Sequence, residues 1–107
     1  MYKVLKTEEF EIQLRKLEGN EKVRVEKTLN QIREKGSRVG KPLSGLRFLR
    51  EKKFEGKRAY FLVYKEFGIV LLTAIGNKKS QREDIDEIVR NLEVYRKIIE
   101  DWLKNPP

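Results

Sequence analysis

Residues 69–75 (IVLLTAI) form a nearly continuous apolar run that is bounded by Gly68 and Gly76. A strand that is apolar on both faces must be covered on both faces, so this run predicts a central strand of a sheet. Two more strand candidates precede it, LRFLREKKF at 46–54 and KRAYFLVY at 57–64, and the segments EGK and KEFG mark the turns between the strands. We therefore predict an antiparallel meander that needs helices to cover it.

Apolar residues at helical spacing predict such helices both before and after the meander in the sequence. A short strand at 2–6 is followed by a helix capped by Thr7, a second helix capped by Asn20, and an ordered loop at 36–45. Residues 81–104 carry apolar side chains at helical spacing and predict one long amphipathic helix. The chain is thus expected to form a single α+β domain over residues 1–107, in the order β-α-α-β-β-β-α.

The composition excludes several kinds of chemistry. The chain has no cysteine and no histidine, which removes disulfides, thiol nucleophiles, Cys/His zinc sites and catalysis by imidazole. We predict no metal and no cofactor. No stretch resembles a membrane span or a signal peptide, so we expect a cytoplasmic protein without a membrane partner.

Positive charge is concentrated in the middle of the chain. The net charge is +8, and residues 41–65 hold eight basic and two acidic residues. Such a segment attracts phosphate backbones. A solvated surface that only keeps the protein soluble is the alternative interpretation.

The basic residues fall on two neighbouring strands. Alternation places Arg50 and Lys52 on one side of their strand and Arg58 and Tyr60 on one side of the next. If the EGK turn pairs these strands, cations lie opposite one another, which is destabilising unless an anion binds among them. Lys78 and Lys79 could close the same patch from the end of the third strand, although a loop that only needs solubility would explain them equally well.

The segment GKRAYFLVYKEFGIVLLTAIGNKK, together with KPLSGLRFLR upstream, resembles the RelE/ParE superfamily of toxins from toxin–antitoxin modules. The similarity covers about residues 40–90, and the order of elements agrees over the whole chain. It implies a RelE-like fold and a toxin that a cognate antitoxin protein neutralises. The RelE-like and HigB-like branch, which we favour, implies a ribosome-dependent mRNA endoribonuclease.

In such an enzyme the ribose 2′-hydroxyl attacks the adjacent phosphate. The resemblance implies that Arg58 and Lys79 stabilise phosphate charge and that Lys52 is the general base or assists the leaving group, with Arg50 completing the basic pair of its strand. We predict RNA contacts for a second set of residues, with Tyr60 stacking on a base: Arg47, Lys53, Lys57, Tyr60 and Lys78.

The sequence departs from this branch at one point. It has no histidine, and Ser80 and Gln81 stand where a C-terminal tyrosine is expected, while Tyr95 fits a core position better. A ParE-like toxin that binds DNA gyrase, or an RNA-binding domain whose nuclease site has decayed, therefore stays open.

The last helix offers a second surface. Val94, Ile98 and Leu103 widen its apolar stripe beyond the core positions. We interpret the extra width as a groove for the antitoxin or as a homodimer contact; a helix buried on two sides is the alternative.

Overall fold

The computed structural model describes residues 1–43 and 45–107. Its elements follow the order β1 (Lys3–Lys6), α1 (Glu8–Arg15), α2 (Gly19–Lys35), η1 (Gly36–Arg38), β2 (Lys41–Leu43), β3 (Leu46–Phe54), β4 (Lys57–Tyr64), η2 (Lys65–Phe67), β5 (Ile69–Asn77), α3 (Gln81–Arg90) and α4 (Leu92–Lys104). The two η elements are short 3-10 helices. The predicted α+β class is confirmed, with an added short strand β2 and a C-terminal helix that is divided in two.

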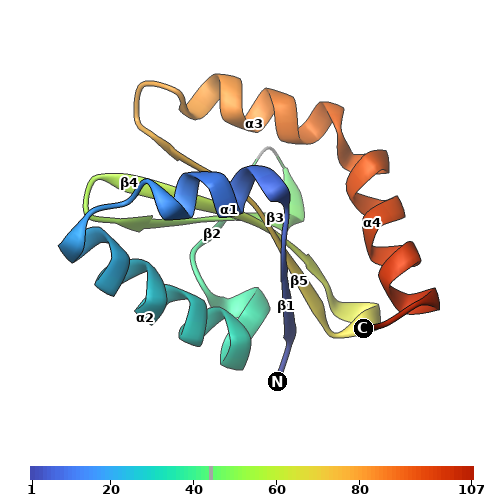
Figure 1. Ribbon diagram of the computed structural model, residues 1–107. Coiled ribbons are helices and arrows are strands. Elements are labelled where there is room, and N and C mark those ends of the chain that lie inside the picture. Colours follow the sequence, from blue (N-terminus) through green and yellow to red (C-terminus); the bar gives the residue numbers. More distant parts are fainter. Residues whose placement is uncertain (44) are drawn as a thin grey trace.

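The described residues contain one sheet of five strands, in the order β1-β5-β4-β3-β2 (Figure 1). Strands β3, β4 and β5 form the predicted antiparallel meander, and β1 pairs in parallel with β5. Every residue of β5 from Ile69 to Ile75 is buried. The apolar run is therefore covered on both faces, as predicted.

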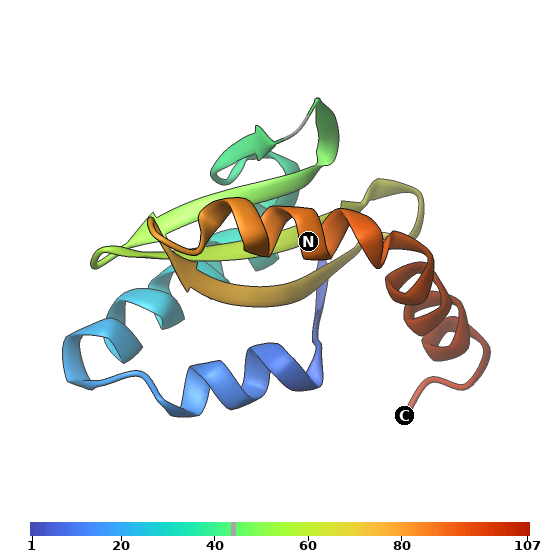
Figure 2. The same cartoon turned by 90° about the horizontal axis from the view of Figure 1, so that it is seen from above.

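The sheet separates two apolar cores (Figures 1 and 2). On one face, α1 and α2 contribute Phe10, Leu29 and Ile32 against side chains such as Phe61. On the other face, α3 and α4 contribute Ile88, Tyr95 and Ile99, and these pack against β4 and β5. Each fully buried side chain of this size contributes about 1.5–3 kcal/mol, so both helix pairs are held firmly to the sheet.

Thr7 ties the start of α1 to the sheet. Its hydroxyl accepts a hydrogen bond from the Phe10 N–H (3.1 Å) and donates one to the Thr73 carbonyl of β5 (2.8 Å). The predicted cap of the first helix is confirmed. The second helix begins earlier than predicted, because Glu18 and Glu21 form a capping box in front of Asn20.

The single long helix predicted over 81–104 is wrong in one respect. The chain turns at Asn91, whose side-chain amide donates to the Glu87 carbonyl (2.9 Å) and so ends α3, and α4 leaves at a steep angle (Figure 2). Helical spacing continues across the break, because Ile88, Tyr95 and Ile99 all face the same core. Periodicity alone cannot reveal a turn that keeps the apolar stripe in register.

Residues 36–45 are more regular than the predicted loop. They contain η1 and the edge strand β2, which pairs with β3 through Lys41 opposite Glu51 and Pro42 opposite Arg50. Proline is tolerated there because an edge strand has one side without ladder partners. Ser44, part of the predicted loop, lies outside the described residues. No helix within the described ranges has the length and apolar character needed to cross a bilayer.

Candidate functional site

The turn between β3 and β4 decides which side chains share a face. Glu55 and Gly56 both have positive φ (43° and 75°), and they form a two-residue turn that pairs Phe54 with Lys57. Lys53 therefore lies opposite Arg58, while Lys52 lies opposite Ala59. The prediction that Arg50 or Lys52 lies across from Arg58 or Tyr60 is wrong, because it assumed a different turn.

Arg50 instead organises the segment before β2. Its Nε and Nη2 donate to the carbonyls of Val39 (2.7 Å) and Gly40 (2.9 Å). Gly40 lies so close to β3 that a Cβ there would overlap the Glu51 carbonyl oxygen. The geometry of Arg50 therefore favours a structural role, not the catalytic role that was predicted for it.

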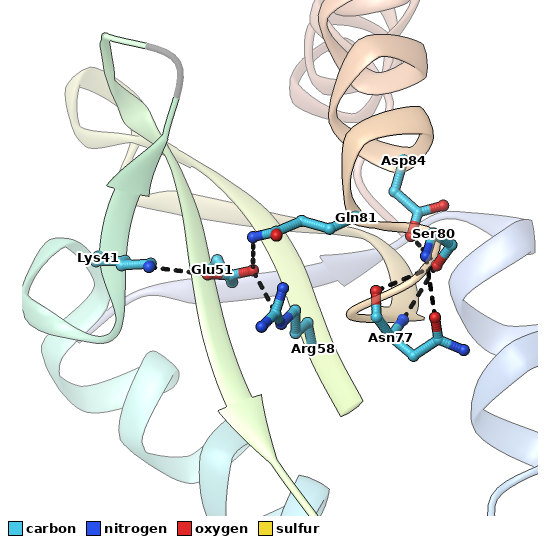
Figure 3. Close-up of polar contacts among 7 residues, drawn as sticks. All are labelled: Lys41, Glu51, Arg58, Asn77, Ser80, Gln81 and Asp84. Carbon is cyan, nitrogen blue, oxygen red and sulfur yellow. Dashed lines mark hydrogen bonds and ion pairs between the residues drawn. The ribbon is translucent and has the colours of Figure 1, made fainter. Parts of the chain in front are cut away.

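Glu51 provides the negative charge that the sequence predicts would come from an anion bound among the basic strands. Its side chain is 0% exposed, and Oε1 lies 3.4 Å from the Arg58 Nε. Lys41 Nζ lies 3.7 Å from Oε2, and Gln81 of α3 donates a 2.8 Å hydrogen bond to Oε1 (Figure 3). The residue opposite Tyr60 is thus a carboxylate, not another cation. Sequence reasoning missed Glu51, and a correct assignment of the two-residue turn would have placed it on this face.

This buried cluster keeps unused hydrogen-bonding capacity. Glu51 Oε2, Arg58 Nη1 and Tyr60 Oη are buried and have no hydrogen-bond partner among the residues that the structure describes. Arg58 itself is 9% exposed. Unpaired donors that are shielded from water interact strongly with an anion that reaches them, so the buried Arg58 guanidinium can supply positive charge to such an anion.

Tyr60 does not fit its predicted role as a stacking surface for RNA bases. It is 0% exposed and belongs to the core under α3 and α4. Burial, with the nearby carboxylates of Asp84 and Glu51, raises the pKa of Tyr60 to about 12, and the Arg58 guanidinium opposes the shift. Its ring packs, as aromatic strand residues usually do.

The other predicted cations divide between the two sides of the sheet. Lys52 is half-buried and lines a cleft of about 370 Å³ between α2 and β3, together with Lys27 and the exposed Lys53. Because Lys52 lies opposite Ala59 and Lys53 opposite Arg58, the Lys52 side chain points to the sheet face away from Arg58. Arg47 is exposed near the start of β3, and Lys78 and Lys79 are exposed in the turn after β5.

A second cleft, of about 340 Å³, opens at the end of the sheet where β4 begins and β5 ends. We call it the α1–α3 cleft. Lys57 lies there, 3.7 Å from Glu21 and partly exposed. Nine residues line the cleft: Gln13, Lys16, Leu17, Lys57, Ile75, Gly76, Asn77, Ser80 and Asp84.

The α1–α3 cleft is polar without being a metal centre. Within residues 1–43 and 45–107, no group of three or more acidic side chains is arranged to hold a metal ion. Its polar side chains are lysines, amides, a serine hydroxyl and one carboxyl. Such groups can bind phosphate and move protons, which are the requirements of phosphodiester chemistry without a metal.

Comparison with solved structures finds the same fold in bacterial toxins. Isolated E. coli RelE superposes with a TM-score of 0.65 at 21% identity, covering 82% of this chain and 99% of RelE. RelE in the intact E. coli RelBE toxin–antitoxin complex gives 0.63 at 21% identity, covering 72% and 96%. The M. tuberculosis RelBE2 toxin–antitoxin complex gives 0.52 at 21% identity, covering 72% and 98%. No family model and no curated protein matches the sequence.

Proposed function

We propose, from the RelE-like fold of this chain, that the protein is the toxin of a toxin–antitoxin pair and cleaves mRNA on the ribosome. The observation that carries the proposal is the fold shared with E. coli RelE over 82% of the chain. The cations near the end of the sheet where β4 begins and β5 ends support it. The proposed substrate is the RNA phosphodiester, and the proposed partner is an antitoxin protein.

Arg58 and the lysines around it would bind the RNA. Arg58 and Lys57 belong to β4, Lys53 lies opposite Arg58, and Lys78 and Lys79 follow β5. Their charges would attract the backbone, and the phosphorane that forms during cleavage would gain most from a cation held in a dry place. We assign this last role to Arg58, whose Nη1 is buried and without a partner in the described residues.

Glu51 would fix Arg58 in position for this role. The Nε–Oε1 contact of 3.4 Å and the hydrogen bond from Gln81 to Oε1 hold the pair together. A preorganised guanidinium does not have to reorient during the reaction, which is the source of much electrostatic catalysis.

The proposed antitoxin would cover the basic strands or the exposed apolar stripe of α4. Val94 and Ile98 on α4 are 57% and 39% exposed, so the wide stripe predicted there is solvent-accessible in this chain. The solved RelE structures include complexes with antitoxin RelB. We propose that an amphipathic segment of the antitoxin docks on this stripe, on the basic strands, or on both.

Induced expression in a heterologous cell, with primer-extension mapping of a reporter mRNA, tests the nuclease. Cuts within translated codons, lost in an Arg58→Lys variant that stays folded, support the proposal. Growth arrest with intact mRNA and blocked supercoiling would support the gyrase-binding alternative instead. A folded protein that has no effect on growth or mRNA would favour the decayed RNA-binding domain.

A further inference from the structure

Gly76 of β5 makes room for a carboxyl group. A Cβ at this position would overlap Asp84 Oδ2 and would lie 2.9 Å from the Ser80 hydroxyl. Asp84 reaches back from the first turn of α3, and the Ser80 hydroxyl donates a 2.7 Å hydrogen bond to Oδ2 (Figure 3). The absence of a side chain at Gly76 therefore leaves room for one carboxyl at the wall of the α1–α3 cleft, where the Ser80 hydroxyl binds it.

The same point of the sheet carries Arg58. Gly76 and Arg58 are directly opposite in the β4–β5 pair, so their side-chain directions share one face. Opposite positions in an antiparallel pair lie about 5 Å apart. Asp84 occupies the space above Gly76, so its carboxyl and the Arg58 side chain lie on the same face of the sheet, with the Arg58 guanidinium turned towards Glu51.

The surroundings shift the pKa of this carboxyl upwards. Burial raises the pKa of Asp84 above its ordinary value, Glu87 and Glu83 add to the rise, and the hydrogen bond from Ser80 opposes it. Asp84 in turn raises the pKa of Glu9 on α1 and of Tyr60 on β4. The titratable and charged groups around it are Glu83 and Glu87 on its own helix and, on the elements packed nearby, Glu9, Lys16, Lys57 and Tyr60.

The α1–α3 cleft has the size and lining to hold one nucleotide of an RNA chain. Its 340 Å³ lies within the range of small-ligand sites, about 300–1,000 Å³. Lys16 and Lys57 can bind phosphate oxygens, and the Asn77 and Gln13 amides can bind sugar or base. A phosphate on these lysines lies in the same cleft as the Asp84 carboxyl.

We propose that Asp84 is a catalytic residue that donates its proton to the leaving 5′-oxygen during RNA cleavage. The ribose 2′-oxygen forms a bond to phosphorus, its proton passes to a water molecule, and the bond from phosphorus to the 5′-oxygen breaks. The 5′-oxygen takes the Asp84 proton and leaves as a hydroxyl, and the other product ends in a 2′,3′-cyclic phosphate. Asp84 regains a proton from solvent. This inference rests on the proposed endoribonuclease function.

Asp84→Asn tests the role with little change of shape, because the amide oxygen can still accept from Ser80. Single-turnover cleavage of ribosome-bound mRNA should slow by about 10²–10⁴-fold, the usual contribution of a general acid. Asp86→Asn is the matched control, since Asp86 is an exposed carboxyl of the same helix, and its rate should stay within about twofold of the wild type. An unchanged rate in Asp84→Asn overturns the proposal.

A substrate with sulfur in place of the bridging 5′-oxygen separates proton donation from binding. A thiolate leaves without a proton, so Asp84→Asn and the wild type should cleave this RNA at similar rates. An equal loss on the oxygen and sulfur substrates would show that Asp84 binds or supports the site instead, and would refute the role of acid.

Gly76→Ala provides a second variant that leaves the carboxyl in the sequence and displaces it. We expect slower cleavage of the oxygen substrate with an unchanged melting temperature, since the overlap is with a side chain that can rotate. Carbon-13 NMR titration of Asp84 measures its pKa without any activity, and a value at or below that of an exposed aspartate would overturn the proposal. Wild-type protein that leaves RNA intact refutes the endoribonuclease function itself, and the role of Asp84 with it.

Discussion

Removing the Arg58 guanidinium should destabilise the protein strongly. The partner left behind, Glu51, has a side chain that is 0% exposed, and a buried ion pair that loses one member costs about 3–5 kcal/mol. Gln81 still donates to Glu51, and Lys41 still lies 3.7 Å away. We therefore expect Arg58→Ala to lower the free energy of unfolding by about 3 kcal/mol, the low end of this range.

Urea unfolding followed by the fluorescence of Trp102 measures this loss. Trp102 is the single tryptophan, and it packs against the core of α3 and α4. With an m-value of about 1.5 kcal/mol per M, the midpoint should fall by about 2 M. Arg47→Ala is the control, because Arg47 is exposed on β3 and its removal should change stability by less than about 0.5 kcal/mol.

A double variant identifies the cause. If the unpaired carboxylate produces the loss, Glu51→Leu combined with Arg58→Leu should be more stable than Arg58→Ala alone, since both charges have then left the interior. The reasoning is refuted if Arg58→Ala costs no more than Arg47→Ala. A like-charged cluster, as the sequence alone predicts, would give that small cost.

Three further predictions concern the surface, the tyrosines and the charge. Ile98→Asp should leave the fold intact and abolish capture of the proposed antitoxin, because Ile98 is 39% exposed, whereas Ile99→Asp should unfold the domain, because Ile99 is 0% exposed. Circular dichroism and co-purification measure both, and unfolding of Ile98→Asp would contradict the exposed stripe. Burial raises the pKa of Tyr60 to about 12, so the fold favours the neutral phenol, and this stabilisation is complete below about pH 10 and lost as the pH rises through 12. Tyr60→Phe should therefore lose less stability than the wild type between these pH values in urea titrations, and an equal loss would argue against this environment. The affinity for RNA should fall linearly with salt on logarithmic axes, with a steep slope; filter binding at several salt concentrations measures it, and an affinity independent of salt would count against recognition of phosphates.

The sequence predicted the elements well because their patterns are local. Alternation and helical spacing depend on neighbours a few residues apart, and Thr7 caps its helix through Phe10, three positions away. The apolar run at 69–75 also correctly predicted a strand that is buried on both faces. The order of elements followed from these signals.

The arrangement of the site was less predictable because it depends on register. One residue more in the turn at Glu55 and Gly56 would exchange the two faces of β3, which is why Glu51 was missed and Lys52 was placed with Arg58. A positive φ at a glutamate such as Glu55 is uncommon, and the residues next to it in the sequence do not predict it. Asp84 was missed for another reason: its position above Gly76 exists only once α3 has folded back on β5.

The parallel pairing of β1 with β5 has a consequence for synthesis. Val4 pairs with Val70, and Thr7 bonds to the carbonyl of Thr73, 66 residues further along, so the first strand acquires its partner only after this long intervening segment has been made. Contacts between such distant positions form late and slow folding. Gly76 and Asp84 come later still, so the α1–α3 cleft cannot form before Asp84 has been synthesised. In a protein of this topology, β1 and α1 must therefore wait without their final partner while the residues between them and β5 are synthesised.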